Sequence, residues 1–555
     1  MSRGRNLGKL AAIGGFTAVA ALLTGLGSAG ADELSDLRAN QQLLQARIDQ
    51  LAASVNNNGS PEQQAAITPG PVVAGAPSLA GSFPRSFLIP GTNTSIAITG
   101  YVKFDMQEYI TGGSTGVGSG VNEIYGLPGT AGAALDLRGP PGSITAAPAY
   151  NQAKRNMWIF HDTAAESRFR IETRTPTDIG QVTTVLEMDM AGCTVDTAVC
   201  SQLDNGTFTS LTRLRLAYGT VGGFLAGQAF IPVNDNDAHP ETLDFGGDAG
   251  TFGFSRAPWI GYTWQLPYGV SFLVAAVTPA TLLWTPVAGV ATGCNPQTTS
   301  TTANAGISNC PAGIENLAIN PTKSQLPDGN FVLRAEQPWG HVQAGAVVQR
   351  NTINDGAFLD QNFVGYGGGV SGNVRPNFPF PYFSSKDNFG FNVFAGDGLG
   401  HYANPSGGGE PTTSNGLQSN FGLVGVACNA TTGIGCYGNA AGGPTATTPG
   451  NAALVRTSTV PQEGFELNYQ HWWLPNVRST VTVGWQANWM NIGILGRNTE
   501  TLNYNKEFWT SHANLLWSPV SFIDTGIEYF YGQRLTLLNQ RANLQVVDYA
   551  FKVKF

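Results

Sequence analysis

The chain has 555 residues, of which only 12% are charged, and its formal net charge is −8. Average soluble domains carry about 25% charged residues, so a string of ordinary soluble domains is disfavoured, and the acidic balance argues against a nucleic-acid partner. No apolar run outside the N-terminus approaches the roughly 20 residues that a membrane helix needs. A chain short of charge and without helical spans is typical of a membrane β-barrel, and its 71 glycines and 11 tryptophans suit the tight turns and interface girdles of such barrels.

Residues 1–31 have the pattern of a secretory signal peptide. Three basic residues precede the apolar stretch Leu10–Leu26, and Ala29-Gly30-Ala31 forms an A-x-A cleavage site before Asp32. A retained membrane helix is the alternative, but the apolar core is short and glycine-rich. Removal of this segment takes three of the 29 basic residues and none of the 37 acidic ones, which leaves a net charge of −11.

Residues 32–53 change to a helical period and predict a short coiled coil, followed by a linker at 54–84. One heptad position is occupied by Leu34, Gln41, Ile48 and Val55, and the other by Leu37, Leu44 and Leu51. All of these residues are apolar except Gln41. Three heptads are marginal alone, so we expect self-association, with Gln41 setting the register. A single amphipathic helix lying on a membrane or on the barrel is the alternative. The linker is rich in Pro, Gly and Asn and has one charged residue, Glu62.

From residue 85 to residue 555 the pattern is one of strands and turns. In Ser167–Thr175, three arginines and Glu172 alternate with Phe169, Ile171 and Thr173, so an extended strand places all the charges on one face. A soluble sheet or a membrane barrel with a wet lumen would both accommodate such a strand. The same alternation of side chains, with a period of two residues, occurs in 96–106, 182–190, 211–218, 331–336, 465–470 and 477–485.

Six cysteines fall in three close pairs, in loops rich in Gly, Thr and Asn. The pairs are Cys193 with Cys200, Cys294 with Cys310, and Cys428 with Cys436. In an exported chain these spacings favour three local disulfides. A metal site is the rival interpretation, but none of the spacings matches a zinc motif. The last two pairs lie in long insertions at about 279–328 and 403–461, which we expect on the outer side.

The C-terminal strand favours the membrane alternative. Val547, Tyr549, Phe551, Val553 and Phe555 alternate with Asp548, Ala550, Lys552 and Lys554. A terminal strand of alternating aromatics that ends in phenylalanine is typical of outer-membrane barrels, and a soluble sheet gains nothing from it.

With these residues in view, the chain resembles the DcaP-like family of trimeric outer-membrane porins. The likeness lies in the coiled coil and in Ser86–Ser95, Gly100–Asp105, Gly227-Gln228, Pro240–Phe245, Tyr469–Ser479 and Asn514–Pro519. The resemblance implies an all-β fold, a 16-stranded antiparallel transmembrane barrel over 85–555, and a homotrimer in the outer membrane with its coiled coils in the periplasm. It also implies uptake of small anionic solutes such as dicarboxylates. The cysteine-bearing loops and the two long insertions depart from the family pattern.

In such a barrel the arginines must face the lumen. An Arg at the lipid midplane costs about 2–4 kcal/mol, so a one-residue slip of the strand 167–175 would cost on the order of 10 kcal/mol. We predict that the lumen is lined by Lys103, Arg168, Arg170, Arg174, Arg213, Arg215, Arg256 and Arg334. One hypothesis is a cationic ladder that passes a dicarboxylate along several weak sites. The other is a structural network in which Glu172, Glu187 and Asp189 neutralise the arginines, and the two can coexist.

The segment Asn234–Trp264 is the candidate for a constriction loop folded into the lumen. It is too long for a turn and holds charges of both signs, which across a narrow pore would create a transverse field. Its acidic candidates are Asp235, Asp237, Glu241 and Asp244, besides Asp248 and the basic Arg256. A solvated external loop is the alternative. Trp259, Tyr262 and Trp264 fit an interface girdle better than a stacking site.

An enzyme is a weaker hypothesis for this chain. Its six histidines are scattered, and neither a G-x-S-x-G elbow nor an H-E-x-x-H or P-loop motif occurs. We therefore expect no catalytic residue, no metal and no cofactor. A porin for small anionic solutes remains the main hypothesis, and its alternatives are a non-selective general porin and a structural or adhesive outer-membrane trimer.

Overall fold

The computed structural model describes about half of the chain, including nearly all of the predicted strands. The described residues are 80–111, 159–191, 212–243, 248–280, 283–284, 322–323, 326–354, 360–375, 384–403, 421–425, 455–489, 491, 505–536 and 541–555. The predicted signal peptide, coiled coil and most of the linker lie outside these residues, as do Asp244 and all six cysteines. Those predictions therefore stay predictions.

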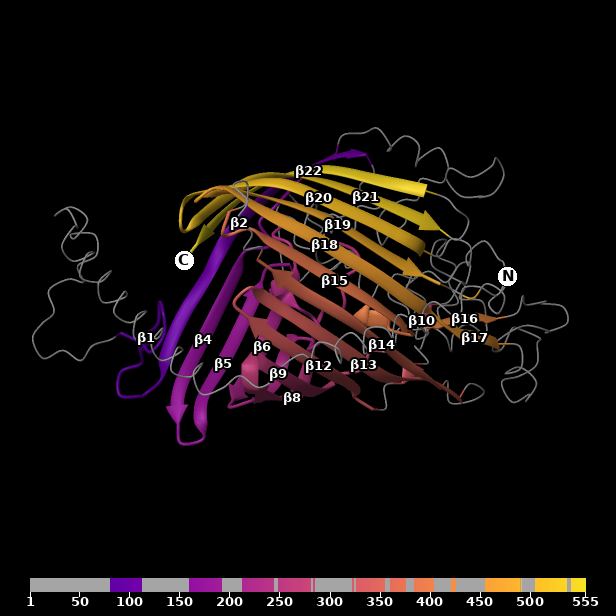
Figure 1. The fold of residues 1–555 in the computed structure, drawn as a ribbon, viewed down its shortest axis with the longest axis horizontal. Coiled ribbons are helices and arrows are strands. Elements are labelled where there is room, and N and C mark those ends of the chain that lie inside the picture. Colours follow the sequence, from indigo (N-terminus) through magenta and orange to yellow (C-terminus); the bar gives the residue numbers. More distant parts are fainter. Residues whose placement is uncertain are drawn as a thin grey trace, which may run out of the picture.

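Sixteen strands form a single closed barrel. They are β2 (Ser95–Thr111), β4 (Arg168–Thr177), β5 (Gly180–Asp189), β6 (Arg213–Val221), β7 (Phe224–Phe230), β8 (Arg256–Leu266), β9 (Val270–Val277), β12 (Asp328–Gln337), β13 (Gly340–Asn354), β14 (Asp360–Val374), β15 (Asn388–Asp397), β18 (Pro461–Leu474), β19 (Val477–Asn488), β20 (Asn505–Val520), β21 (Ile523–Thr536) and β22 (Arg541–Lys554). Every neighbouring pair is antiparallel, and β22 pairs with β2 to close the ring. Figure 1 follows the wall from β2 in indigo to β22 in yellow, which lie side by side. The predicted all-β, 16-stranded barrel is confirmed.

Shorter elements supplement the wall. They are β1 (Phe87–Leu88), β3 (Ile159–Thr163), β10 (Leu283–Trp284), β11 (Thr322–Lys323), β16 (Phe421–Gly425), β17 (Val455–Thr459), and the 3-10 turns η3 (Asn236–Ala238), η4 (Pro267–Gly269) and η5 (Gly400–Tyr402). Strands β10, β16 and β17 form a separate three-stranded sheet. Among the described residues, no helix has the length and apolar character that a membrane-spanning helix needs.

Side chains alternate between the two faces of the wall, as the sequence predicts. On β2, Val102 and Phe104 are 57% and 38% exposed on the outer face, whereas Lys103, Asp105 and Gln107 are buried on the inner face. An apolar outer face suits lipid, and polar groups inside keep contact with each other and with water. The alternation therefore determines which residues can act on a solute.

A bulge interrupts the strand that pairs with β2. Thr163 of β3 lies opposite Asp105 and Arg168 of β4 lies opposite Tyr101, so four residues of one strand face three of the other. Such an extra residue locally bends a strand and re-aims its side chains. Here it places the carboxylate of Glu166 in a buried ion pair with Lys103.

The connection between β7 and β8 folds into the barrel instead of leaving it. Its residues Ile231, Val233 and Phe252 are buried in a cluster with side chains of the surrounding strands. A Cβ on Gly484 of β19 would lie 2.2 Å from the carbonyl oxygen of Ala249, which shows how closely this loop lies on the wall. We call residues 231–255 the inner loop, of which 244–247 are not among the described residues.

The structure corrects the predicted end of this loop. Strand β8 begins at Arg256, so the last nine residues of the stretch Asn234–Trp264 belong to the wall. Tyr262 and Trp264 are exposed on the outer face, as an interface girdle requires. Trp259 instead points inward, where it is buried and its Nε1 donates a 2.9 Å hydrogen bond to the carbonyl oxygen of Phe230.

Candidate pore and constriction site

The inner face of β4 carries the predicted arginines, and Glu172 lies between two of them. Its carboxylate accepts hydrogen bonds from Arg170 at 2.9 Å and from Arg174 at 2.7 Å. The three residues lie on one face because they are two positions apart along an extended strand. Both arginines are therefore partly neutralised where they stand.

Strands β5 and β6 continue this charge network. Strand pairing places Arg168 opposite Asp189 and Arg170 opposite Glu187. Arg215 of β6 bridges both carboxylates, at 2.8 Å from Glu187 and 3.0 Å from Asp189. Further ion pairs join Arg213 to Asp189 at 2.7 Å, Arg170 to Glu187 at 3.4 Å and Arg168 to Glu187 at 3.5 Å. The structural network of the second hypothesis is thus present in the fold.

The network does not neutralise the wall completely. Strands β4 to β8 carry six arginines against three carboxylates, which gives these strands a net charge of +3. Arg256, at the start of β8, has no ion-pair partner among the residues that the structure describes. Its guanidinium lies 5.5 Å from the ring centroid of Phe230, a contact that leaves the charge unbalanced.

On the opposite side, Glu241 anchors the inner loop to the wall. Arg478 of β19 donates two hydrogen bonds to its carboxylate, at 2.6 and 2.5 Å, and Gln470 of β18 donates a third at 2.7 Å. Burial by itself would raise the pKa of Glu241, but Arg478 outweighs it and the pKa is lowered. The carboxylate therefore stays ionised and holds the loop in place.

A second anchor is built around Asp235, which is fully buried. It accepts hydrogen bonds from His341 at 2.8 Å, Ser371 at 2.8 Å and Arg334 at 3.0 Å. Burial would raise the pKa of Asp235, yet these donors lower it. Arg334 also binds Asp237 at 2.6 Å, so both acidic groups act as fixed contacts between the loop and the wall.

Three groups near this anchor could in principle surround a cation. Ligand atoms of Asp237, Glu336 and His341 lie within 4.8 Å of one another. The guanidinium of Arg334 donates to both carboxylates of this group. An arginine thus already supplies the positive charge there.

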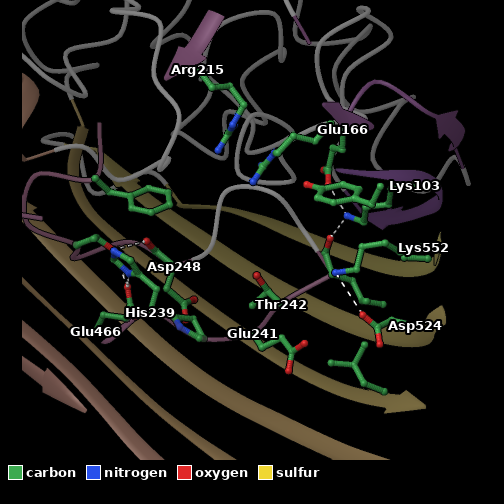
Figure 2. Close-up of a pocket in the computed structure, with 18 of the residues that line it drawn as sticks. Lys103, Glu166, Arg215, His239, Glu241, Thr242, Asp248, Glu466, Asp524 and Lys552 are labelled. Carbon is green, nitrogen blue, oxygen red and sulfur yellow. Dashed lines mark hydrogen bonds and ion pairs between the residues drawn. The ribbon is translucent and has the colours of Figure 1, made fainter. Parts of the chain in front are cut away.

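Between the inner loop and the arginine wall lies a cavity of about 330 Å³. Arg168, Arg215 and Arg256 line one side, and Glu241 and Asp248 of the loop line the other. Figure 2 shows Arg215 pointing into this space from above, with Asp248 and Glu241 below it. Charged groups of both signs thus border this cavity.

Asp248 of the inner loop is fully buried beside His512 and Glu466. Its Oδ1 lies 3.6 Å from Nε2 of His512. Burial raises the pKa of Asp248 to about 6, against the smaller opposing effect of His512. This carboxyl therefore changes charge in the mildly acidic range.

Lys103, predicted from the sequence to line the pore, borders the cavity but is buried. Its Nζ binds Glu166 and donates a 2.5 Å hydrogen bond to the carbonyl oxygen of Leu243. Arg478 and Glu166, which bind Glu241 of the loop and Lys103, are not among the pore residues predicted from the sequence. Alternation along 477–485 already placed Arg478 on the inner face, whereas nothing in the local pattern signalled the bulge that brings Glu166 inside.

The closed antiparallel barrel, its apolar outer face and its charged lumen narrowed by an internal loop define the architecture of a porin. The porin subfamily matches residues 85–357 of this chain. Among solved structures, the outer-membrane channel DcaP of Acinetobacter baumannii is similar with a TM-score of 0.56 and 18% identity, over 86% of this chain and 100% of that one. The chain thus has the fold of a DcaP-like porin, and the resemblance inferred from the sequence is confirmed.

Two further solved outer-membrane proteins match the chain with lower TM-scores. They are OmpT of Vibrio cholerae, with a TM-score of 0.41 and 8% identity over 84% of this chain and 99% of that one, and an anion-selective porin from Comamonas acidovorans, with a TM-score of 0.42 and 8% identity over 83% and 100%. No curated protein sequence matches the chain. The porin match and the barrel together support a channel of the outer membrane.

Proposed function

We propose that this chain is an outer-membrane porin for passive diffusion of small hydrophilic anions of the dicarboxylate type. The observation that carries the proposal is the net charge of +3 on strands β4 to β8, with Arg256 bordering the cavity and unpaired among the described residues. A guanidinium stays charged at any relevant pH and offers forked donors that match a carboxylate.

The paired arginines set the strength of binding. Because Arg168, Arg170 and Arg215 already share Glu187, a solute carboxylate competes with a protein carboxylate and is held only weakly. Conduction requires such loose binding at several sites. A cavity of about 330 Å³ admits a small solute, and the guanidinium of Arg256 at its border would attract a solute carboxylate.

We further propose a homotrimer with its N-terminal coiled coils in the periplasm and each barrel in contact with outer-membrane lipid. The heptad pattern of residues 32–53 and the family resemblance support this assembly. Each insertion of the protein into a planar bilayer should then give three equal conductance steps, one for each barrel.

The test of selectivity is the reversal potential of the purified protein across a KCl gradient. We expect anion preference, and its reduction in Arg256→Gln. The matched control is Arg350→Gln, because Arg350 is exposed on the wall and hydrogen-bonded to Asn362. That variant removes the same charge away from the cavity and should leave selectivity unchanged.

The size of the effect follows from Coulomb's law. A unit charge about 6 Å from the path of an ion in water contributes about 0.7 kcal/mol, with opposite sign for anion and cation. Screening at 0.1 M salt roughly halves this, so the anion-to-cation permeability ratio should fall about three- to tenfold. A parent protein without anion preference would favour a non-selective general porin, and an unchanged ratio in Arg256→Gln would show that Arg256 does not set the selectivity.

Liposome swelling tests the solute class. Dicarboxylates should enter faster than neutral solutes of equal size, and replacement of Arg168, Arg170 and Arg174 by serine should remove that advantage. Equal rates before and after the replacement would show that these arginines are purely structural. The absence of any conductance or swelling would support a structural or adhesive trimer instead.

A further inference from the structure

The N-terminal end of the described chain folds back onto the barrel wall. Residues 81–86, which we call the N-terminal turn, are closed by a 3.0 Å hydrogen bond from the N–H of Gly81 to the carbonyl oxygen of Ser86. The N–H of Ser82 donates to Oγ of Ser95 at 2.9 Å, and Ser95 at the start of β2 is buried. Directly after the turn, β1 pairs with the start of β2, at the end of the barrel where Figure 1 also shows the C-terminus.

The N-terminal turn places an aromatic ring on one arginine of the lumen. The ring centroid of Phe83 lies 4.3 Å from Cζ of Arg174. Arg174 lies directly opposite Ser95 in the pairing of β4 with β2, so the bond that fixes Ser82 to the wall is next to the arginine that Phe83 covers. A cation is attracted to the face of an aromatic ring by the quadrupole of the ring. The ring therefore restrains the guanidinium from one side.

Glu172 holds the same guanidinium along one edge. Nε and Nη2 of Arg174 donate to Oε1 of Glu172 at 2.9 and 2.7 Å. Nη1 donates to no acceptor among the residues that the structure describes, and the side chain of Arg174 is 37% exposed. A carboxylate thus fixes one edge of the guanidinium and Phe83 fixes one face, while the N–H groups of Nη1 stay available to a solute.

We propose that Phe83 is a positioning residue for solute anions and that Arg174, held by it, binds a solute carboxylate through Nη1. The inference rests on the proposed function as an anion porin. An arginine that is free to rotate loses rotamer freedom when it binds a carboxylate, and affinity scales with the fraction of side chains already in the competent geometry. Phe83 raises that fraction without neutralising the charge. Of the arginines on β4, Arg174 lies closest to the end of the barrel where the N-terminal turn is attached.

A role of Phe83 in packing alone makes a different demand on the side chain. Any apolar side chain of similar size would then cover the turn, and leucine would replace Phe83 without loss. Only a flat aromatic face attracts a guanidinium. Under the proposal, tyrosine therefore replaces Phe83 and leucine does not, so the two substitutions separate the two roles.

The experiment measures the conductance of the full chain in planar bilayers at pH 7 with increasing succinate. N-methyl-D-glucamine is the counter-ion, so that the anion carries the current. Conduction through a binding site saturates, and each protein gives a half-saturating concentration and a maximal conductance. In Phe83→Leu the half-saturating concentration should rise about two- to fivefold, the factor that corresponds to an exposed cation–π contact. The maximal conductance should not fall, because looser binding speeds release.

Two further variants test whether Phe83 acts through Arg174. Phe83→Tyr should behave as the parent protein does. In an Arg174→Gln background, Phe83→Leu should have no additional effect, because both changes then remove the same interaction. The matched control is Phe87→Leu, which changes a ring of β1 that is 47% exposed and pairs with Ile96. It should leave the half-saturating concentration and the maximal conductance unchanged.

The conductance itself verifies folding, since only a folded barrel conducts. The inference is overturned if Phe83→Leu keeps the half-saturating concentration of the parent, or if it lowers only the maximal conductance. It is also overturned if tyrosine fails to restore binding, or if Phe83→Leu weakens binding equally in the Arg174→Gln background. A parent protein that conducts no succinate overturns the proposed function as well, whereas a conducting parent with an unaffected Phe83→Leu overturns only the role of Phe83.

Discussion

Glu241 offers the sharpest test of how the inner loop is held in the lumen. Glu241→Gln keeps the shape of the side chain but removes the charge that Arg478 binds through two hydrogen bonds. Hydrogen bonds to charged groups contribute about 1.5–3 kcal/mol. Since the glutamine can still accept one bond, and Arg478 keeps its 2.8 Å contact with Ser518, we expect a total loss near this range and not twice it.

This loss should appear as local opening of the loop, because the strands of the barrel keep their own hydrogen bonds. The N–H groups of Leu243 and Ala249 are bonded to Glu528 and Thr510, and both should exchange with deuterium about ten- to 150-fold faster in the variant. Peptide-resolved hydrogen exchange measures this effect. Open-channel current noise should rise with it.

The matched control is Glu463→Gln on the same strand as Gln470. Glu463 bonds Trp489 instead of the loop, so exchange at Leu243 and Ala249 should not change. If Glu241→Gln leaves the exchange of both amides within a factor of two of the parent, packing and the other polar contacts of the loop, such as those of Asp235, suffice to hold it. The anchoring role of the Arg478 pair would then be refuted.

Three further predictions concern pH, packing and the membrane face. Because the pKa of Asp248 in the fold is about 6, above its ordinary value, the folded state binds the extra proton and the resulting stability is lost as pH rises through about 6. Asp248→Asn should therefore reduce the gain in the urea midpoint on going from pH 7.5 to 5. Gly484→Ala should destabilise the protein by about 1–3 kcal/mol in urea unfolding, because the new Cβ would meet the carbonyl oxygen of Ala249 at 2.2 Å. Phe104→Arg should cost about 2–4 kcal/mol in lipid vesicles, because it places a charge on the outer face opposite Phe551.

Each of these predictions has its own control. An equal pH dependence in the parent and in Asp248→Asn would show that Asp248 does not cause the effect. Gly219→Ala, whose nearest atom would be 3.8 Å away, should be close to neutral. Ile179→Arg, at a turn where the side chain is 75% exposed, should cost at most about 1 kcal/mol. Equal costs for Ile179→Arg and Phe104→Arg would contradict the placement of the outer face in lipid.

The residue pattern along each strand determined much of this protein before any tertiary contact was known. Side chains alternate with a period of two, so one strand such as β4 already assigns Arg168 and Arg170 to one face and Phe169 to the other. A one-residue slip would move every charge to the lipid side. The same alternation made a contact of Glu172 with Arg170 or Arg174 one of two hypotheses, and the structure shows both contacts.

Only the tertiary structure decided which charges meet across the lumen. Glu241 and Arg478 are 237 residues apart in the chain, and their contact depends on the path of the inner loop and on the register of β19, neither of which leaves a local periodic signal. The same holds for the bulge that brings Glu166 to Lys103, and for Arg256, whose position at the end of the loop leaves it unpaired among the described residues. Local alternation determines the face on which a side chain lies, whereas the closure of the barrel and the course of the loop determine which residue it contacts.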